Sequence, residues 1–346
     1  MRYVSILILL ISTLALSGAV INSDDESPTT QPDPFAQIHG MTISCHGSGR
    51  SWGSDAMVES MAKLKAMGVN WIAIHPYAGI NPNGTVGGSS RRSRMYQDTT
   101  WLTRPIEEAH KLGLKIMIKP HIAYWGSPFS WRGEIEFETE EQWARFFETY
   151  QQWITMVAEL SADADAFVVG TELGKTVHHE KPWRMIIAAI KQKFKGPLTY
   201  CANWDRYEDV PFWDALDVIA LQSYFPLVSH SNLPSPDELD KSWEKLIARL
   251  ESFAKKNNRK ILLGELGYNR SSNAALRPWE SRQGGEQAEE TQRRCLTAAL
   301  PAIDSSEWIV GAFLWKWFPG ESGRGSFIKS TPTMRKVISD HWVNTQ

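Results

Sequence analysis

The amino-acid sequence predicts an α/β protein built as a single (β/α)8 TIM barrel. From residue 37 onward, short apolar segments alternate with stretches whose apolar residues recur at helical spacing. Eight such pairs occupy about 310 residues, and eight is the number of units that closes a parallel barrel. A doubly wound open sheet is the main alternative, and the count of eight favours the barrel.

The strand segments are recognised as apolar runs, such as 261–263, that suit parallel strands buried on both faces. Helical periodicity marks the stretches between them, and Gly68 and Gly113 stand where helices are expected to end before the next strand. A barrel of this kind carries its chemistry at the carboxyl ends of the strands. In chain order the predicted strands are 38–45, 69–75, 114–119, 166–172, 198–203, 218–224, 261–266 and 309–317.

Two features of the composition narrow the choice of partner. Lys and Arg total 37 and Asp and Glu total 39, for a formal net charge of −2, so the chain lacks the cationic surplus that nucleic-acid binding requires. Tryptophan is abundant, at 16 residues against 13 Phe. A core alone would more naturally be filled with Leu, Ile, Val and Phe, so some of the indoles are expected to serve another purpose.

The first 36 residues are expected to precede the folded domain. Met1 and Arg2 lead into an apolar run at 4–16 and a small-residue exit, the pattern of a secretory signal. The run is too short to span a bilayer. We assign 1–19 to a signal peptide, 20–36 to a flexible leader and 37–346 to the folded domain. The protein is therefore expected to be secreted or periplasmic, free of the membrane after signal removal, and monomeric.

Two glutamates end predicted strands. Glu172 and Glu265 each follow an apolar run, where burying a carboxylate is costly unless the site uses it. They are 93 residues apart, or three βα units of 31, so both are expected at the same rim. Glycoside hydrolysis needs such a pair: one protonates the leaving oxygen, and the other attacks the anomeric carbon or activates water. A structural ion pair explains one strand-end glutamate equally well, but two in phase favour catalysis.

Aromatic and polar residues gather at the other predicted strand ends. Indole faces stack on the C–H faces of sugars, while amides and imidazoles bind the hydroxyls. Indoles on helical stripes, such as Trp143, are assigned to packing, and Trp125 is expected at the rim. The candidates for substrate binding are Trp52, His75, His121, Trp131, Asn203, Trp204, Tyr224, Trp315 and Trp317.

Several segments together resemble glycoside hydrolase clan A and, within it, glycoside hydrolase family 113, whose activity is chiefly on β-1,4-mannan. They run in order across nearly the whole folded part: KPH at 119–121, SWRGEI at 130–135, GTEL at 170–173, LTY at 198–200, ANWD at 202–205, SYFPL at 223–227, GELGY at 264–268 and WKW at 315–317. This resemblance implies a retaining hydrolase of mannan or glucomannan that acts by double displacement.

The same resemblance implies roles for individual residues. Glu172 would be the acid/base and Glu265 the nucleophile, with Tyr224 hydrogen-bonded to the nucleophile and Trp315 as the floor of the subsite for the reacting sugar. Thr171 stands where many clan members have an Asn that holds the 2-hydroxyl, so Thr171 or Asn203 would take that part. A retaining mechanism requires carboxyl carbons about 5–5.5 Å apart. Glu172 should then have the higher pKa, raised by the charge on Glu265 and by partial burial.

Other functions fit the sequence less well. The segment 47–53 resembles a dinucleotide loop, but its spacing is one residue too long and strand two ends in His75, so no cofactor is expected. The histidines and three cysteines match no zinc pattern, so no metal is expected. A retaining β-glucanase of the same clan and a non-catalytic carbohydrate-binding barrel are the alternatives. In each, the expected substrate or ligand is a neutral polysaccharide or oligosaccharide, and the sequence does not distinguish mannan from glucan or endo from exo action.

Overall fold

The computed structural model describes residues 37–47, 49–87, 97–321, 325 and 327–343. The signal peptide at 1–19 and the leader at 20–36 lie outside the described residues. None of the helices within the described ranges is long and apolar enough to cross a membrane.

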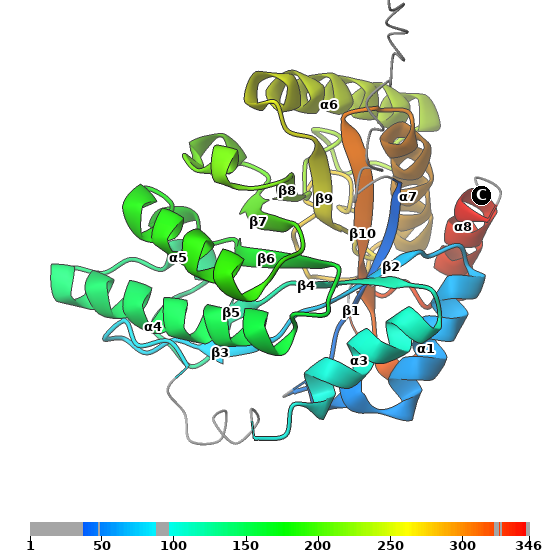
Figure 1. Ribbon diagram of the computed structural model, residues 1–346. Helices are drawn as coiled ribbons and strands as arrows, with labels where there is room; N and C mark the ends of the chain where they lie inside the picture. The colour runs from blue at the N-terminus through cyan, green and yellow to red at the C-terminus, as the bar shows by residue number, and fades with distance from the viewer. Residues whose placement is uncertain (1–36, 48, 88–96, 322–324, 326, 344–346) are drawn as a thin grey trace, which may run out of the picture. The chain divides into compact units, whose positions relative to one another are not determined.

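Eight parallel strands form a closed barrel, which confirms the predicted fold (Figure 1). They are hydrogen-bonded in the order β1-β10-β9-β8-β7-β6-β4-β2, and β1 pairs with both β2 and β10 to close the ring. All eight predicted strands are present, several shorter by one to three residues because residues at one or both of their ends lie outside the hydrogen-bonded ladder. They are β1 (Ile38–Ile43), β2 (Trp71–Ile74), β4 (Lys115–Ile118), β6 (Ala166–Thr171), β7 (Leu198–Asn203), β8 (Ile219–Gln222), β9 (Ile261–Leu266) and β10 (Ile309–Trp317).

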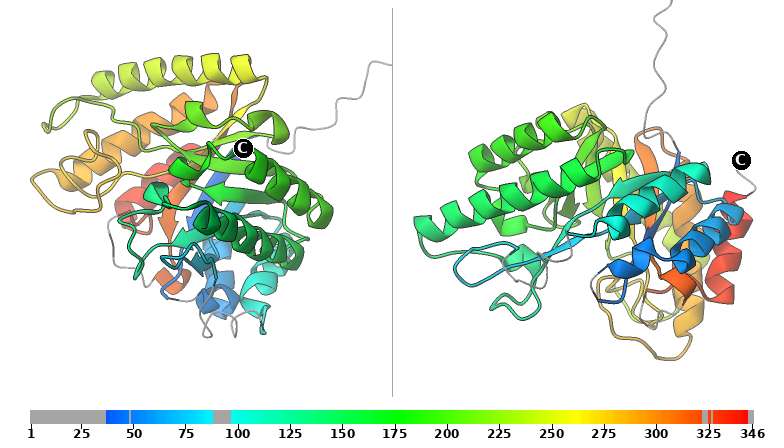
Figure 2. Two further views of the ribbon diagram at one scale, coloured as in Figure 1. Left: turned by 90° about the vertical axis from the view of Figure 1, so that its left-hand side faces the viewer. Right: turned by 60° about the horizontal axis from the view of Figure 1, so that its bottom comes forward.

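Helices follow the strands in chain order and cover the outside of the barrel (Figure 2). Neighbouring helices pack together, α4 beside α5 and α6 beside α7. Gly68 and Gly113 have positive φ angles of 86° and 67° just after α1 and α3, as expected of residues that end helices. The helices are α1 (Asp55–Ala66), α3 (Thr100–Lys111), α4 (Glu140–Leu160), α5 (Glu180–Lys193), α6 (Pro236–Asn257), α7 (Ala288–Asp304) and α8 (Pro332–Trp342).

Side-chain caps start three of these helices. The Thr139 hydroxyl accepts the Gln142 N–H, and the Gln142 side chain accepts the Thr139 N–H, which is a complete capping box at the start of α4. Ser235 and Thr331 cap α6 and α8 by accepting the N–H groups of Glu238 and Met334, and each is followed by a proline that suits the first turn. These caps place the helix starts, and hence the loops that precede them, at defined positions.

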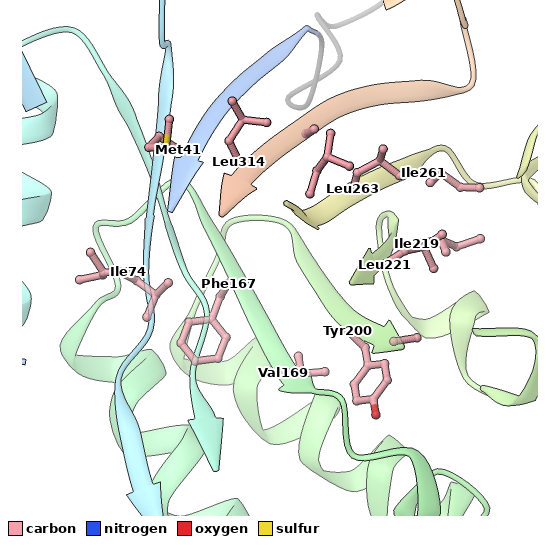
Figure 3. Packing of buried hydrophobic residues seen from close by; sticks show 14 of the residues in the cluster. Met41, Ile74, Phe167, Val169, Tyr200, Ile219, Leu221, Ile261, Leu263 and Leu314 are labelled. Carbon is pink, nitrogen blue, oxygen red and sulfur yellow. The ribbon is translucent and has the colours of Figure 1, made fainter. Parts of the chain in front are cut away.

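The strands bury both faces. Phe167 and Val169 belong to the layer between strands and helices that Figure 3 shows, whereas Val168 belongs to a second cluster to which all eight strands contribute. Members from every strand identify that second cluster as the barrel interior. Trp71 and Phe313 meet there edge to face at 6.2 Å. The interior is therefore packed with apolar side chains, and polar chemistry is confined to the strand ends.

A small second sheet was not predicted from the sequence. Strands β3 (Tyr77–Gly79) and β5 (His121–Ala123) pair in parallel directly beyond β2 and β4, with Tyr77 opposite His121. Three-residue strands are too short to give a readable alternation. The sheet prolongs the barrel on one side and brings two aromatic residues to the carboxyl-end rim.

Candidate active site

Glu265 ends β9 and receives a hydrogen bond on each carboxylate oxygen. The Lys119 ammonium lies 2.6 Å from Oε1, and the Tyr224 hydroxyl donates to Oε2 at 2.8 Å. Lys119 also donates to the Gly264 carbonyl at 3.0 Å. Lys119 is completely buried and Glu265 only 4% exposed. Two donors from different strands thus hold the carboxylate in one orientation.

Glu172 follows β6 in an unusual backbone conformation. Its φ is +53°, a left-handed value that a residue with a Cβ seldom adopts and that functional sites often retain. Its N–H donates to the Cys201 carbonyl at 2.8 Å. The residue is 9% exposed, and its Oε2 accepts a 2.8 Å hydrogen bond from Arg132 Nη1. The turn directs this carboxylate away from the strand ladder and towards a buried guanidinium.

The pKa of Glu172 is raised above its ordinary value. Burial is the main cause, and the charge of Glu265 raises it further, whereas the Arg132 charge and hydrogen bond act in the opposite direction. This direction agrees with the expectation from the sequence. Because the charge of Glu265 acts on Glu172, the two carboxyl groups lie within electrostatic reach of each other.

Lys119 and Arg132 were not identified as site residues from the sequence. Both are cations buried to the same degree as the carboxylates they contact. Arg132, in the short helix η3 (Arg132–Glu134), also donates from Nε to the Ile122 carbonyl at 3.1 Å. The sequence did offer a sign of Lys119: a lysine directly after the apolar run of the third strand is expected to be buried, and a buried lysine requires a partner.

Trp315, near the end of β10, is half-buried, so part of its indole reaches solvent. Lys119 Nζ lies 5.2 Å from its ring and Lys316 Nζ 4.9 Å. His121 lies nearly parallel to the indole at 6.4 Å, and its Nε2 is 3.8 Å from Glu265 Oε1. Among the residues that the structure describes, neither ring nitrogen of His121 finds a hydrogen-bond partner. Trp315 and His121 are therefore placed beside Glu265, where a sugar would need a stacking face and polar groups.

Three of the predicted binding residues are buried. Trp52 is 1% exposed, and its indole N–H donates to the Ile43 carbonyl at 2.9 Å. Trp317 has no exposed surface, and Arg335 covers its ring at 5.0 Å. His75 is also fully buried, bonds to Ser44 Oγ at 3.1 Å and packs on Trp315 and His121. The prediction that these three contact substrate is therefore wrong in this structure, and His75 instead supports the two rings in front of it.

The register of β10 explains the position of Trp317. Two residues of one regular strand that are two positions apart share a face. Here β1 pairs Thr42 with Trp315 but the next residue, Ile43, with Trp317, so the register shifts between the two indoles. Trp315 thus stays at the rim while Trp317 is buried in the core. An alternation counted along the sequence cannot reveal such a shift.

The remaining candidates stand near the rim. Trp131 is half-buried and packs over Gly133, where a Cβ would lie 1.9 Å from the indole. The Asn203 amide donates to Asp205 Oδ1 at 2.5 Å, and the half-buried Trp204 follows it. The Thr171 hydroxyl donates to the Pro120 carbonyl at 3.1 Å and is 1% exposed, so of the two residues expected at the 2-hydroxyl it is the less available.

The described residues contain no group of three or more His, Cys, Asp or Glu side chains that could hold a metal. The arrangement is instead one of two buried carboxylates at the carboxyl rim of a (β/α)8 barrel. One is held by an ammonium and a phenol and the other has a raised pKa, which is the equipment of a glycoside hydrolase.

Comparison with known proteins identifies the family. The profile described as Glycoside Hydrolase Family 113 matches residues 41–322, so the chain belongs to this family and is a glycoside hydrolase. No curated protein matches the chain significantly. Among solved structures, a family 113 β-mannanase from Alicyclobacillus acidocaldarius, in complex with ManMIm, is 25% identical with a TM-score of 0.74 and covers 91% of this chain and 100% of its own.

Two further structures share the fold. A family 113 β-1,4-mannanase is 21% identical with a TM-score of 0.75, covering 89% of this chain and 99% of its own. A β-glucuronidase from Ruminococcus gnavus is 13% identical with a TM-score of 0.58, covering 89% of this chain and 50% of the other. The barrel is thus similar to those of a β-glucuronidase and of the mannanases, and the mannanases, unlike the β-glucuronidase, are themselves covered over nearly their whole length.

Proposed function

We propose that this hydrolase cleaves β-1,4-linked mannan or glucomannan with retention of configuration, by double displacement. Glu265 is the nucleophile and Glu172 the acid/base. The single observation that supports this assignment best is the contrast between the two carboxyl groups: Glu265 accepts from Lys119 and Tyr224, while Glu172 has a raised pKa. One group is oriented for attack, and the other is favoured in the protonated form.

In the first step, Glu265 attacks the anomeric carbon and the glycosidic C–O bond breaks, while Glu172 transfers its proton to the leaving oxygen. Arg132 suits the state that follows, because its guanidinium lies 2.8 Å from Glu172 and stabilises the carboxylate left behind. In the second step, ionised Glu172 takes a proton from water, which attacks the glycosyl-enzyme and releases Glu265. Burial and Arg132 therefore favour opposite protonation states of Glu172, as a group that must act as both acid and base requires.

The preference for mannan is supported by the two structural relatives named as β-mannanases, which this chain covers almost end to end. A near-zero net charge is compatible with a neutral polymer, for which electrostatic steering has no use. Trp315 supplies the stacking face for the reacting sugar, with His121 and Asn203 as candidates for its hydroxyls. The signal pattern at 1–19 supports secretion or export to the periplasm.

The substrate is tested by release of reducing ends from mannan, glucomannan and cellulose in parallel. We expect the greatest kcat/KM on the mannan-containing polymers, and Glu172→Gln and Glu265→Gln to lose nearly all activity. Glu244→Gln is the matched control, because Glu244 is exposed on α6. Cleavage of cellulose alone would assign a glucanase, and sugar binding without any cleavage would exclude an enzyme.

The roles of the two glutamates are tested by azide rescue with an activated aryl β-mannoside. Azide should restore turnover of Glu172→Ala and give a β-glycosyl azide, because the covalent intermediate still forms. With Glu265→Ala, azide should replace the nucleophile and give the α-azide. The opposite pairing would exchange the roles, and an α-configured first product from the unmodified enzyme would establish inversion.

A further inference from the structure

Trp204 and Trp279 form a stacked pair of tryptophans, one half-buried and one exposed. Four large apolar side chains in the described part of the chain are exposed, and two of them are Trp279, at 46%, and Trp125, at 61%. Trp279 lies in the loop between β9 and α7, the loop that follows Glu265. Its ring stacks on Trp204 at 5.4 Å with an interplanar angle of 16°. Since Trp204 covers one face of Trp279, the exposed surface includes the other face.

The loop that carries Trp279 is anchored on both sides of it. The Asn269 side chain is 1% exposed and donates to the carbonyls of Glu280 and Arg282. On the other side, the Ala275 carbonyl accepts the Leu227 N–H at 2.8 Å, and Ala275 is buried. The indole is therefore presented at a defined position. An indole held at a defined position, with one face exposed, offers the flat apolar surface on which the C–H face of a pyranose ring can stack.

A chain of aromatic contacts connects this pair to the reacting centre. Tyr224 donates to Glu265, the next residue Phe225 contacts Trp204 at 5.7 Å, and Trp204 stacks on Trp279. Trp204 directly follows β7, the barrel neighbour of β6, which leads to Glu172. A general acid protonates the leaving oxygen, so the leaving sugar lies on the Glu172 side of the scissile bond. Because Trp204 follows the strand that neighbours β6, its position favours the leaving-group side for the Trp204–Trp279 pair.

We propose that the Trp204–Trp279 pair is a binding subsite for a β-linked hexopyranose unit on the leaving-group side, beyond the sugar next to the scissile bond. The inference rests on the proposed function for its position and on the exposed, stacked indoles for its ligand class. An indole face binds the C–H face of a pyranose ring, and neutral sugars need no charged partner there. The subsite acts only on substrates long enough to reach it.

Substrate length is the test. We expect Trp279→Ala to lower kcat/KM on mannohexaose roughly tenfold, the effect of losing one stacking face. On an aryl β-mannoside, whose leaving group is not a sugar, the variant should stay within about twofold of the unmodified enzyme, since no chemistry is changed. Trp279→Phe keeps a ring and should retain most of the activity on mannohexaose. Met185, which is 56% exposed on α5, provides the control for removing an exposed apolar side chain. Met185→Ala should leave kcat/KM unchanged on both mannohexaose and the aryl β-mannoside.

Two results would overturn the proposal: unchanged mannohexaose cleavage by Trp279→Ala, or an equal loss on both substrates at an unchanged Tm. A binding experiment tests the Trp204–Trp279 subsite independently of the proposed hydrolytic function. In a Glu265→Gln background, indole fluorescence is titrated with mannohexaose and with cellohexaose. A fluorescence change that Trp279→Ala abolishes supports the subsite, even if the unmodified protein cleaves no mannan. The subsite is refuted if neither sugar binds, or if the proteins with and without Trp279→Ala bind equally well.

Discussion

The buried pair of Lys119 and Glu265 makes a quantitative prediction. Lys119→Met removes the cation and leaves Glu265, at 4% exposure, with the Tyr224 hydroxyl as its remaining donor. Breaking one side of a buried ion pair costs about 3–5 kcal/mol, because the other charge stays desolvated. Glu265→Leu leaves the fully buried Lys119 without its carboxylate, next to the Gly264 carbonyl and the Trp315 ring, and should cost about the same. Each single variant should lower Tm by on the order of 10 °C.

The double variant Lys119→Met/Glu265→Leu should regain most of this stability, because it removes both charges and keeps similar volumes. Denaturant unfolding of the four proteins gives a double-mutant cycle, in which we expect a coupling energy that approaches the sum of the two single-variant losses, because the double variant itself loses little. The double variant should be folded and inactive, since it lacks the nucleophile. Additive losses in the double variant would refute the reasoning, since they would show that the two side chains do not compensate each other's burial.

Four further predictions concern the pH dependence, the tryptophans and the metal independence of the site. Burial raises the pKa of Glu172, and Arg132 opposes that rise. Arg132→Met should therefore raise this pKa further and move the alkaline limb of the pH profile of kcat/KM on an aryl mannoside to higher pH. A shift of that limb to lower pH would contradict the role of Arg132. Because that pKa is raised in the folded protein, the stability it contributes is present at low pH and lost as pH rises through it. As the pH rises, the free energy of unfolding of the unmodified protein should therefore fall relative to that of Glu172→Gln. Trp315→Ala should lower kcat/KM on mannan roughly tenfold with little change in Tm. Trp317→Ala should instead cost about 3–5 kcal/mol of unfolding free energy, because it leaves a core cavity. Similar stability losses for the two variants would contradict the difference in burial. EDTA should leave activity unchanged, because protein donors already hold both carboxylates; loss of activity reversed by a divalent cation would show otherwise.

Much of the barrel could be read from the sequence because its signals are local. Strand β9 (Ile261–Leu266) is an unbroken apolar run, and its burial on both faces in the structure is what such a run predicts. The repeat of about 31 residues per βα unit brought Glu172 and Glu265 to one rim, since parallel strands present their carboxyl ends together. Strand-end position and repeat length are properties of the chain itself and need no knowledge of distant contacts.

The partners of those glutamates depend on contacts between distant segments. Lys119 and Glu265 are 146 residues apart, and Arg132 and Glu172 are 40 apart. No periodicity relates such positions, so their pairing follows from the closed order of the strands. The same closure determines which polar residues at neighbouring strand ends can compensate one another's burial.

The tryptophans show the same division most clearly. Their number and their places near strand ends are properties of the sequence, and these indicated a sugar-binding rim. Burial separated them: Trp52 and Trp317 became core, Trp315 stayed half-exposed, and Trp279, which the sequence did not single out, stacks on Trp204. The sequence by itself thus determined the barrel, its glutamate pair and the kind of ligand. Tertiary structure alone decided which indole faces remain available, because exposure depends on register shifts and on loops anchored far along the chain.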